Sequence, residues 1–151
     1  MRKLVVLSSW LIGLALAPPA FAGNNHAVQC NPVPQDLFNV GYSMFGVHNT
    51  TSSNPVTVHC GGAKGFNFFS TMNVTVYDRS TTSDVCCTAR ITDAGGNPLF
   101  SGAACSSGFG SAPQTLSIGL APFGGYIDLQ CSIPAFSPVN GFSHVTTFDI
   151  P

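Results

Sequence analysis

The six cysteines constrain this chain of 151 residues more than any other feature. All of them follow residue 22, and an even number of cysteines in a chain that carries an export signal indicates disulfides. Two of them, Cys86 and Cys87, are adjacent, and adjacent residues of a β-strand point to opposite faces. If this segment is a strand, its two cysteines need partners on both sides of the sheet.

The glycine-rich turn at residues 93–97 predicts a hairpin between segments 85–92 and 98–105. An antiparallel register centred on this turn places Cys86 opposite Cys105, at a spacing that a disulfide can bridge. The remaining cysteines are then free to pair with one another. A bridge between the two adjacent cysteines and a metal site are the alternatives, although the C-x₂-C spacing is absent. We favour three bridges: Cys30–Cys60, Cys86–Cys105 and Cys87–Cys131.

The first 22 residues have the three parts of a secretory signal peptide. Arg2 and Lys3 are followed by an apolar run over residues 4–17 and by a small-residue cleavage pattern that ends at Ala22. The alternative, a membrane anchor, needs roughly 20 apolar residues, and the run is shorter. We therefore expect a secreted or periplasmic protein with one domain over residues 23–151 and no integral membrane segment after cleavage.

Charge is scarce, at 7% of all residues, and there is no Glu. After residue 22 the cations are Lys64, Arg79 and Arg90, too few for a basic surface that binds nucleic acid. A glycosidase site with a pair of Glu side chains is excluded, whereas a pair of Asp side chains is not.

Short segments of alternating apolar residues, separated by turn residues, predict a single antiparallel β-sandwich of about eight strands. This all-β fold leaves residues 23–29 as a loose N-terminal arm. The expected strands lie at 40–44, 56–58, 72–77, 85–91, 98–105, 116–120, 127–133 and 142–150.

No catalytic pattern is present in the sequence. The histidines His26, His48, His59 and His144 lack metal-site spacing, although His48 and His59 end successive predicted strands and could meet. The segment Ser106–Ser111 does not match the G-x-S-x-G elbow of serine hydrolases. We therefore expect no catalytic residue, cofactor or metal. A small hydrolase or metal-dependent enzyme that uses His48, His59, His144 or an Asp remains the alternative.

Two acidic residues flank a predicted turn beside a cation. Asp78 and Asp84 could bind Ca²⁺, but turn capping is the stronger interpretation, with Arg79 paired to one of them.

Phenylalanines in predicted loops are the candidate binding surface. They either form a recognition surface or cover the ends of the sandwich. Sugar binding is not favoured, because the chain after residue 22 has no Trp and three Tyr. The partner is then an unknown protein or glycan at the cell envelope or outside the cell. The candidate residues are Phe66, Phe68, Phe69, Phe123 and Phe136.

In three segments the chain resembles a loose group of uncharacterised exported bacterial proteins with disulfide-containing β-domains. These segments are residues 76–79 leading into 84–87, residues 131–134, and residues 143–148. The resemblance implies one exported, disulfide-bonded β-domain and implies no activity. We therefore expect a non-enzymatic binding or surface-interaction module, with a structural component of the envelope or matrix as a further alternative.

Overall fold

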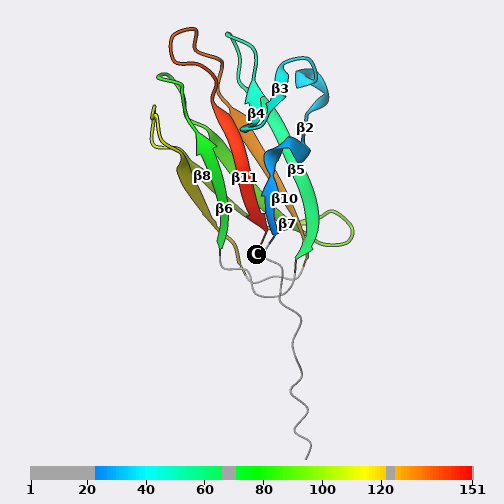
Figure 1. The fold of residues 1–151 in the computed structure, drawn as a ribbon. Helices are drawn as coiled ribbons and strands as arrows, with labels where there is room; N and C mark the ends of the chain where they lie inside the picture. Colours follow the sequence, from blue (N-terminus) through cyan, green and yellow to red (C-terminus); the bar gives the residue numbers. More distant parts are fainter. Residues whose placement is uncertain (1–22, 66–70, 122–124, 151) are drawn as a thin grey trace, which may run out of the picture.

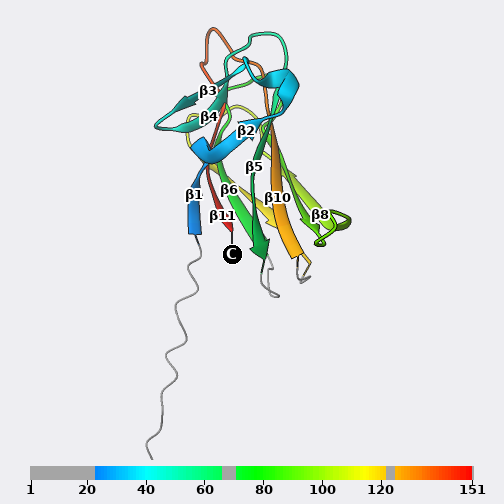
Figure 2. The ribbon, with the colours of Figure 1, turned by 90° about the vertical axis from the view of Figure 1, so that its right-hand side faces the viewer.

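The chain folds into two antiparallel β-sheets that pack face to face (Figure 1; Figure 2). The structure is a computed structural model that describes residues 23–65, 71–121 and 125–150. The all-β sandwich expected from the alternating segments is therefore confirmed. Among the described residues, no helix has the length and apolar character needed to cross a membrane.

The first sheet has six strands in the order β3-β4-β11-β6-β9, with β1 paired to β11 as well. β4 pairs with the first two residues of β11 and β1 with its last four, so these two short strands share one edge of β11. The bounds are β1 (Gly23–His26), β3 (Val40–Ser43), β4 (Gly46–Asn49), β6 (Thr71–Tyr77), β9 (Gln114–Gly119) and β11 (His144–Ile150).

The second sheet has five strands in the order β2-β5-β10-β7-β8. Two short 3-10 helices, η1 (Ala27–Gln29) and η2 (Pro34–Asp36), flank β2, and η1 carries the chain from the first sheet to the second. The bounds are β2 (Cys30–Pro32), β5 (Val56–Gly65), β7 (Cys86–Thr92), β8 (Pro98–Cys105) and β10 (Gly125–Ile133).

The core lies between the sheets and follows directly from the alternation in the sequence. Val74 and Val76 of β6 are fully buried, as are Ile91 of β7 and Leu129 of β10, whereas the residues between them along each strand are less buried. Side chains at alternate positions of a strand share one face, so each strand contributes one apolar row to the interior.

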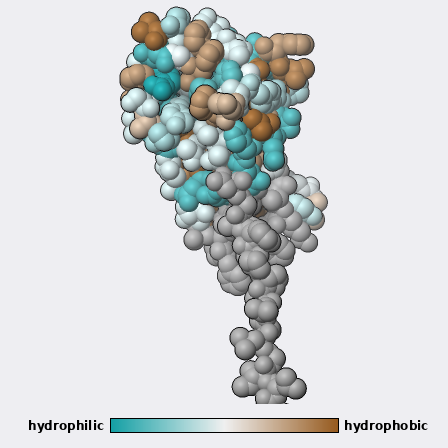
Figure 3. All heavy atoms as spheres, in the orientation of Figure 1, coloured by the Kyte–Doolittle hydropathy of each residue, from teal (hydrophilic) through white to brown (hydrophobic). Residues whose placement is uncertain are grey.

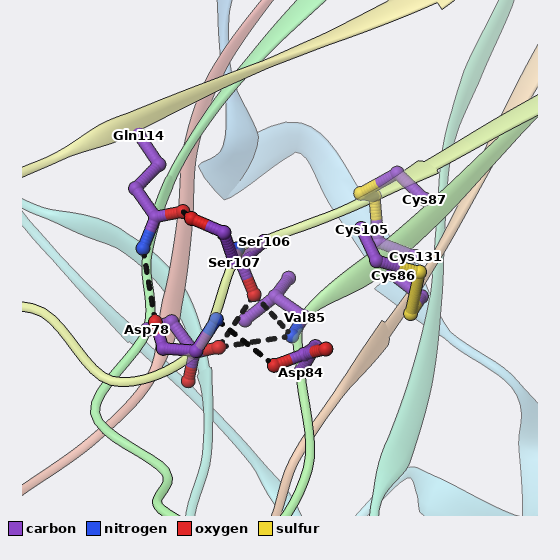
Figure 4. Close-up of a disulfide and its surroundings, with 11 residues drawn as sticks. Asp78, Asp84, Val85, Cys86, Cys87, Cys105, Ser106, Ser107, Gln114 and Cys131 are labelled. Atoms are coloured by element: carbon purple, nitrogen blue, oxygen red, sulfur yellow. Dashed lines mark hydrogen bonds between the residues drawn. A yellow bond between two sulfur atoms is a disulfide. The ribbon is translucent and has the colours of Figure 1, made fainter.

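All three disulfides lie within the second sheet, and their pairing is the one that the sequence favoured. Each joins two cysteines that are direct cross-strand partners, which ties β2 to β5 and links β8, β7 and β10 (Figure 4). Cys87 and Cys131 are fully buried, whereas Cys105 is exposed on the outer face. The adjacent cysteines therefore do use both faces of their strand, as the alternation predicts.

The prediction of a loose arm at residues 23–29 is wrong. Residues 23–26 form β1, which pairs with β11, and Ala27 of η1 is fully buried. The segment lacks apolar alternation because β1 is a short edge strand bound through its backbone, so periodicity could not reveal it. The same limit applies to β2 and β4, which have only three and four residues.

Candidate binding groove on the six-stranded sheet

Four residues form a row across the outer face of the first sheet. His48 of β4 lies opposite Gly41 of β3 on one side and opposite His144 of β11 on the other, and His144 in turn lies opposite Tyr77 of β6. Alternation along the strands directs this row away from the core. Neighbours of the last three along their own strands are buried in the core: Val47, Val145 and Val76.

The two histidine rings of this row are in contact with each other and with aromatic side chains. The ring centroids of His48 and His144 are 5.1 Å apart. On its other side, His48 lies 4.7 Å from the ring of Phe142, which stacks on Phe136 at 4.5 Å. Gly41 provides the space, because a methyl group built on it would overlap Nε2 of His48.

Both histidines are held toward their neutral form. Burial lowers the pKa of His48, and it is also the largest of the causes that lower the pKa of His144. The charges of His48 and Arg79 lower the pKa of His144 further. Nδ1 of His48 is buried without a hydrogen-bond partner among the described residues, so a proton added there would find no acceptor.

A groove of about 400 Å³ opens beside this row, with aromatic walls and two polar groups. Phe45, in the turn between β3 and β4, is 57% exposed and meets the ring of His144 edge-on at 6.4 Å. On the face drawn in Figure 3, several hydrophobic residues lie among hydrophilic ones in the upper part of the view, the part that carries β3 and β4 in Figure 1. The groove is lined by Phe45, Tyr77, Arg79, Ser111 and His144.

The buried carboxylate of Asp78 joins the loops that follow β6 and β8 to the segment that precedes β11 (Figure 4). Asp78 is fully buried and accepts hydrogen bonds from the hydroxyls of Ser106, at 2.5 Å, and of Ser143, at 3.3 Å. It also accepts from the backbone N–H groups of Ser80 and Val85. Several donors therefore satisfy this charge, as a buried charge requires.

The same carboxylate cluster positions the polar side of the groove. The hydroxyl of Ser143 accepts from the backbone N–H of Arg79 at 2.9 Å, and Ser143 directly precedes His144. The backbone carbonyl of Asp78 accepts from the N–H of Gly110 at 3.0 Å, next to Ser111. Arg79, Ser111 and His144 are thus held in place, directly or through an adjacent residue, by hydrogen bonds that involve Asp78 or its partner Ser143.

The structure corrects two pairings expected from the sequence. Arg79 forms no ion pair within the described part of the chain, because Asp78 is engaged by serines and Asp84 accepts from the N–H of Gly108. His59 does not meet His48, because β4 and β5 belong to different sheets. Instead, Nδ1 of His59 lies 3.5 Å from a carboxylate oxygen of Asp128.

The candidate enzyme residues do not assemble into one site in the described part of the chain. His144 and His48 come together, but no group of three His, Cys, Asp or Glu side chains with metal-binding geometry lies within residues 23–65, 71–121 and 125–150. Asp78 accepts from the backbone N–H of Ser80 in its own turn, as the turn-capping interpretation predicted, whereas Asp84 accepts from Gly108 in a different loop.

Of the five predicted binding phenylalanines, Phe136 is the one that the structure describes. It is partly buried against Phe142 at the edge of the histidine row. The remaining four, Phe66, Phe68, Phe69 and Phe123, lie outside the described residues.

Sequence reasoning missed Phe45, Tyr77, Arg79 and Ser111 as groove residues, and Phe142 as a neighbour of the histidine row. The spacing of Phe142 and His144, two positions apart at the start of a strand, was a usable signal that both point to one face. For Phe45 and Arg79 no such signal exists, because they come from turns whose positions depend on the sheet order.

The two-sheet fold also occurs in a domain of known structure. The structure is similar to the CBM36-1 domain of a multidomain xylanase from the hindgut metagenome of Trinervitermes trinervoides, with a TM-score of 0.51. The match covers 85% of this chain and 95% of that chain at 11% sequence identity, so it concerns the fold alone. No family model matches the sequence, and the comparison with curated proteins gives no match.

Proposed function

We propose that this protein is a non-catalytic binding module that binds a glycan in the groove beside the histidine row. The observation that carries the proposal is the groove itself, in which Phe45 and Tyr77 line a space that also contains Arg79 and Ser111. Sugars offer apolar ring faces to aromatic side chains and hydroxyls to polar ones, so a site that combines both suits them.

The sandwich supports this proposal as a scaffold. The groove lies on the outer face of paired strands, and hydrogen bonds to Asp78 hold its polar side in place before a ligand arrives. A preformed site loses less conformational freedom on binding than a mobile one. The fold of the xylanase domain is a further support, because that domain bears the name of a carbohydrate-binding module.

The experiment is affinity electrophoresis of the purified protein in gels that contain one soluble polysaccharide each, such as xylan, β-glucan, dextran or polygalacturonate. We expect at least one polysaccharide to retard the protein. Phe45→Ala and Tyr77→Ala should weaken that retardation by about tenfold or more, the range of an aromatic anchor. Phe38→Ala is the matched control, because Phe38 is 92% exposed and outside the groove.

The proposal fails if none of the polysaccharides retards the protein. It also fails if Phe38→Ala weakens binding as much as Phe45→Ala, because the retardation would then not depend on the groove.

We propose that Phe66, Phe68 and Phe69 add a second contact surface, as their clustering in the sequence suggests. Changing all three to Ser should reduce capture of the protein on cell-envelope or secreted fractions. Unchanged capture would remove them from the proposed binding surface.

We also propose that the protein is exported and that cleavage follows Ala22. The three disulfides are consistent with an oxidising compartment outside the cytoplasm. N-terminal sequencing of the protein from its native host should begin at Gly23, the first residue of β1. A product that begins within residues 24–29 would overturn this site, and a product that keeps residues 1–22 would overturn cleavage.

A further inference from the structure

The guanidinium of Arg79 is a charged group without a counter-ion among the described residues. It lines the groove, yet it forms neither an ion pair nor a side-chain hydrogen bond with any residue that the structure describes. Its nearest carboxylate in the sequence, Asp78, is fully buried and bonded to Ser106 and Ser143. The next one, Asp84, accepts from the backbone N–H of Gly108, in the loop between β8 and β9.

The rest of the groove adds no negative charge. Its other lining residues are Phe45, Tyr77, Ser111 and His144, none of which is an acid. Arg79 lines the groove together with His144, and its charge contributes to lowering the pKa of that histidine. The groove therefore carries a positive charge, with guanidinium N–H donors that are not used within the described structure.

From this arrangement we infer that the groove selects an acidic polysaccharide, with the oxyanion of a sugar residue bound by Arg79 and the sugar ring against Phe45 or Tyr77. A guanidinium binds a carboxylate or a sulfate through paired, charge-assisted hydrogen bonds, which are stronger than bonds between neutral groups. This inference rests on the proposed function and adds the chemical class of the glycan.

The backbone of Arg79 is held by hydrogen bonds, which limits where its guanidinium can meet an anion. Its N–H donates to Ser143, which in turn donates to Asp78, so the backbone from which the side chain extends is held in place. The side chain itself can adjust to the anion. Lys in the same place would keep the charge but lose the planar pair of donors.

The test compares polygalacturonate with the same polymer after full methyl esterification, which removes the charge and leaves the backbone. Dextran sulfate and dextran form a second pair that separates a sulfate from a carboxylate as the bound oxyanion. We expect the charged member of at least one pair to bind at least tenfold more tightly, in a manner that weakens with salt.

Arg79→Gln should remove this preference, with a loss of about tenfold to a hundredfold in affinity for the charged polymer. Arg79→Lys should recover only part of it. Arg90→Gln is the matched control, because Arg90 is exposed on β7 of the other sheet and loses the same charge. Thermal unfolding midpoints should be equal for all three variants, since the side chain of Arg79 has no partner to lose in the described structure.

The possible failures are distinguishable. Equal binding of charged and neutral polymers, or equal effects of Arg79→Gln and Arg90→Gln, overturns the inference and leaves the glycan-binding proposal in place. If no polymer of either kind binds through the groove, both are overturned.

Discussion

His48 and His144 lie opposite each other in the β4–β11 pair, with their ring centroids 5.1 Å apart, although 95 residues of chain lie between them. Neither ring forms an ion pair with a carboxylate in the described structure. The pair is held by packing, between Gly41 and Phe142 on one side and Phe45 on the other. Four consequences of this arrangement and of the elements beneath it can be measured.

The stability of the fold should depend on the charge of these two rings. Because the folded state lowers both pKa values below the ordinary value of 6.5, the unfolded chain binds more protons than the folded one as the pH falls through that value. The free energy of unfolding should therefore decrease from pH 7.5 toward pH 5. Urea unfolding at several pH values measures the slope.

The variant with both His48→Gln and His144→Gln should show a shallower slope, because it has lost the groups that take up those protons. If the double variant and the unchanged protein have the same slope over this range, the two histidines are not its origin.

Space at Gly41 should control the position of His48. Gly41→Ala places a methyl group against the ring, and overpacking of this kind costs about 1–3 kcal/mol of unfolding free energy. In a double-mutant cycle, adding His48→Ala should recover part of that loss, because the methyl group then meets no ring. Strictly additive effects of the two changes, measured by urea unfolding, would show that the methyl group does not act through His48.

The buried carboxylate should matter for both stability and binding. Asp78→Asn replaces one acceptor oxygen by an N–H₂ donor among groups that are themselves donors, which should cost about 2–4 kcal/mol. Retardation by the bound polysaccharide should weaken as well, because the carboxylate no longer holds Ser143, which bonds the backbone of Arg79 and precedes His144.

Asp84→Asn is the matched control for this change, since Asp84 is exposed and accepts a single hydrogen bond, from Gly108. Its effect should stay below about 1 kcal/mol. A loss as large as that of Asp78→Asn would mean that the burial of Asp78 is not the reason for its importance.

The two disulfides of the β8-β7-β10 group should contribute unequally. The sequence separation is 44 residues for Cys87–Cys131 and 19 for Cys86–Cys105, and the longer loop is worth about 0.7 kcal/mol more in chain entropy. Replacing the buried pair by Ala also leaves a cavity in the core, whereas Cys105 is exposed.

We therefore expect C87A/C131A to lower the unfolding free energy by about 3–5 kcal/mol and C86A/C105A by about 2–3 kcal/mol. Urea unfolding under oxidising conditions measures both. The reverse order would show that burial and loop length do not decide their contributions.

Much of the second sheet could be predicted from local sequence. A register centred on Gly95-Gly96 predicts Cys86 opposite Cys105, and the two are partners in the structure. The register shifts between Ile91 and Thr92, beside the turn, so the pairing of the cysteines also depends on this irregularity, which the sequence did not reveal. The short strands β1, β2 and β4 could not be predicted in this way, since three or four residues are too few to show a period.

The candidate groove belongs to the part that only the tertiary structure decided. Alternation along the sequence determined which side chains of each strand are buried, because a period of two separates the two faces of a strand. It carried no information on which strands are neighbours, and the order β3-β4-β11-β6 is what brings His48, His144 and Tyr77 into one row. The sequence also could not show that Arg79 lacks a partner in the described structure. This depends on the burial of Asp78, which is bonded to Ser106 and Ser143, two residues far from it along the chain.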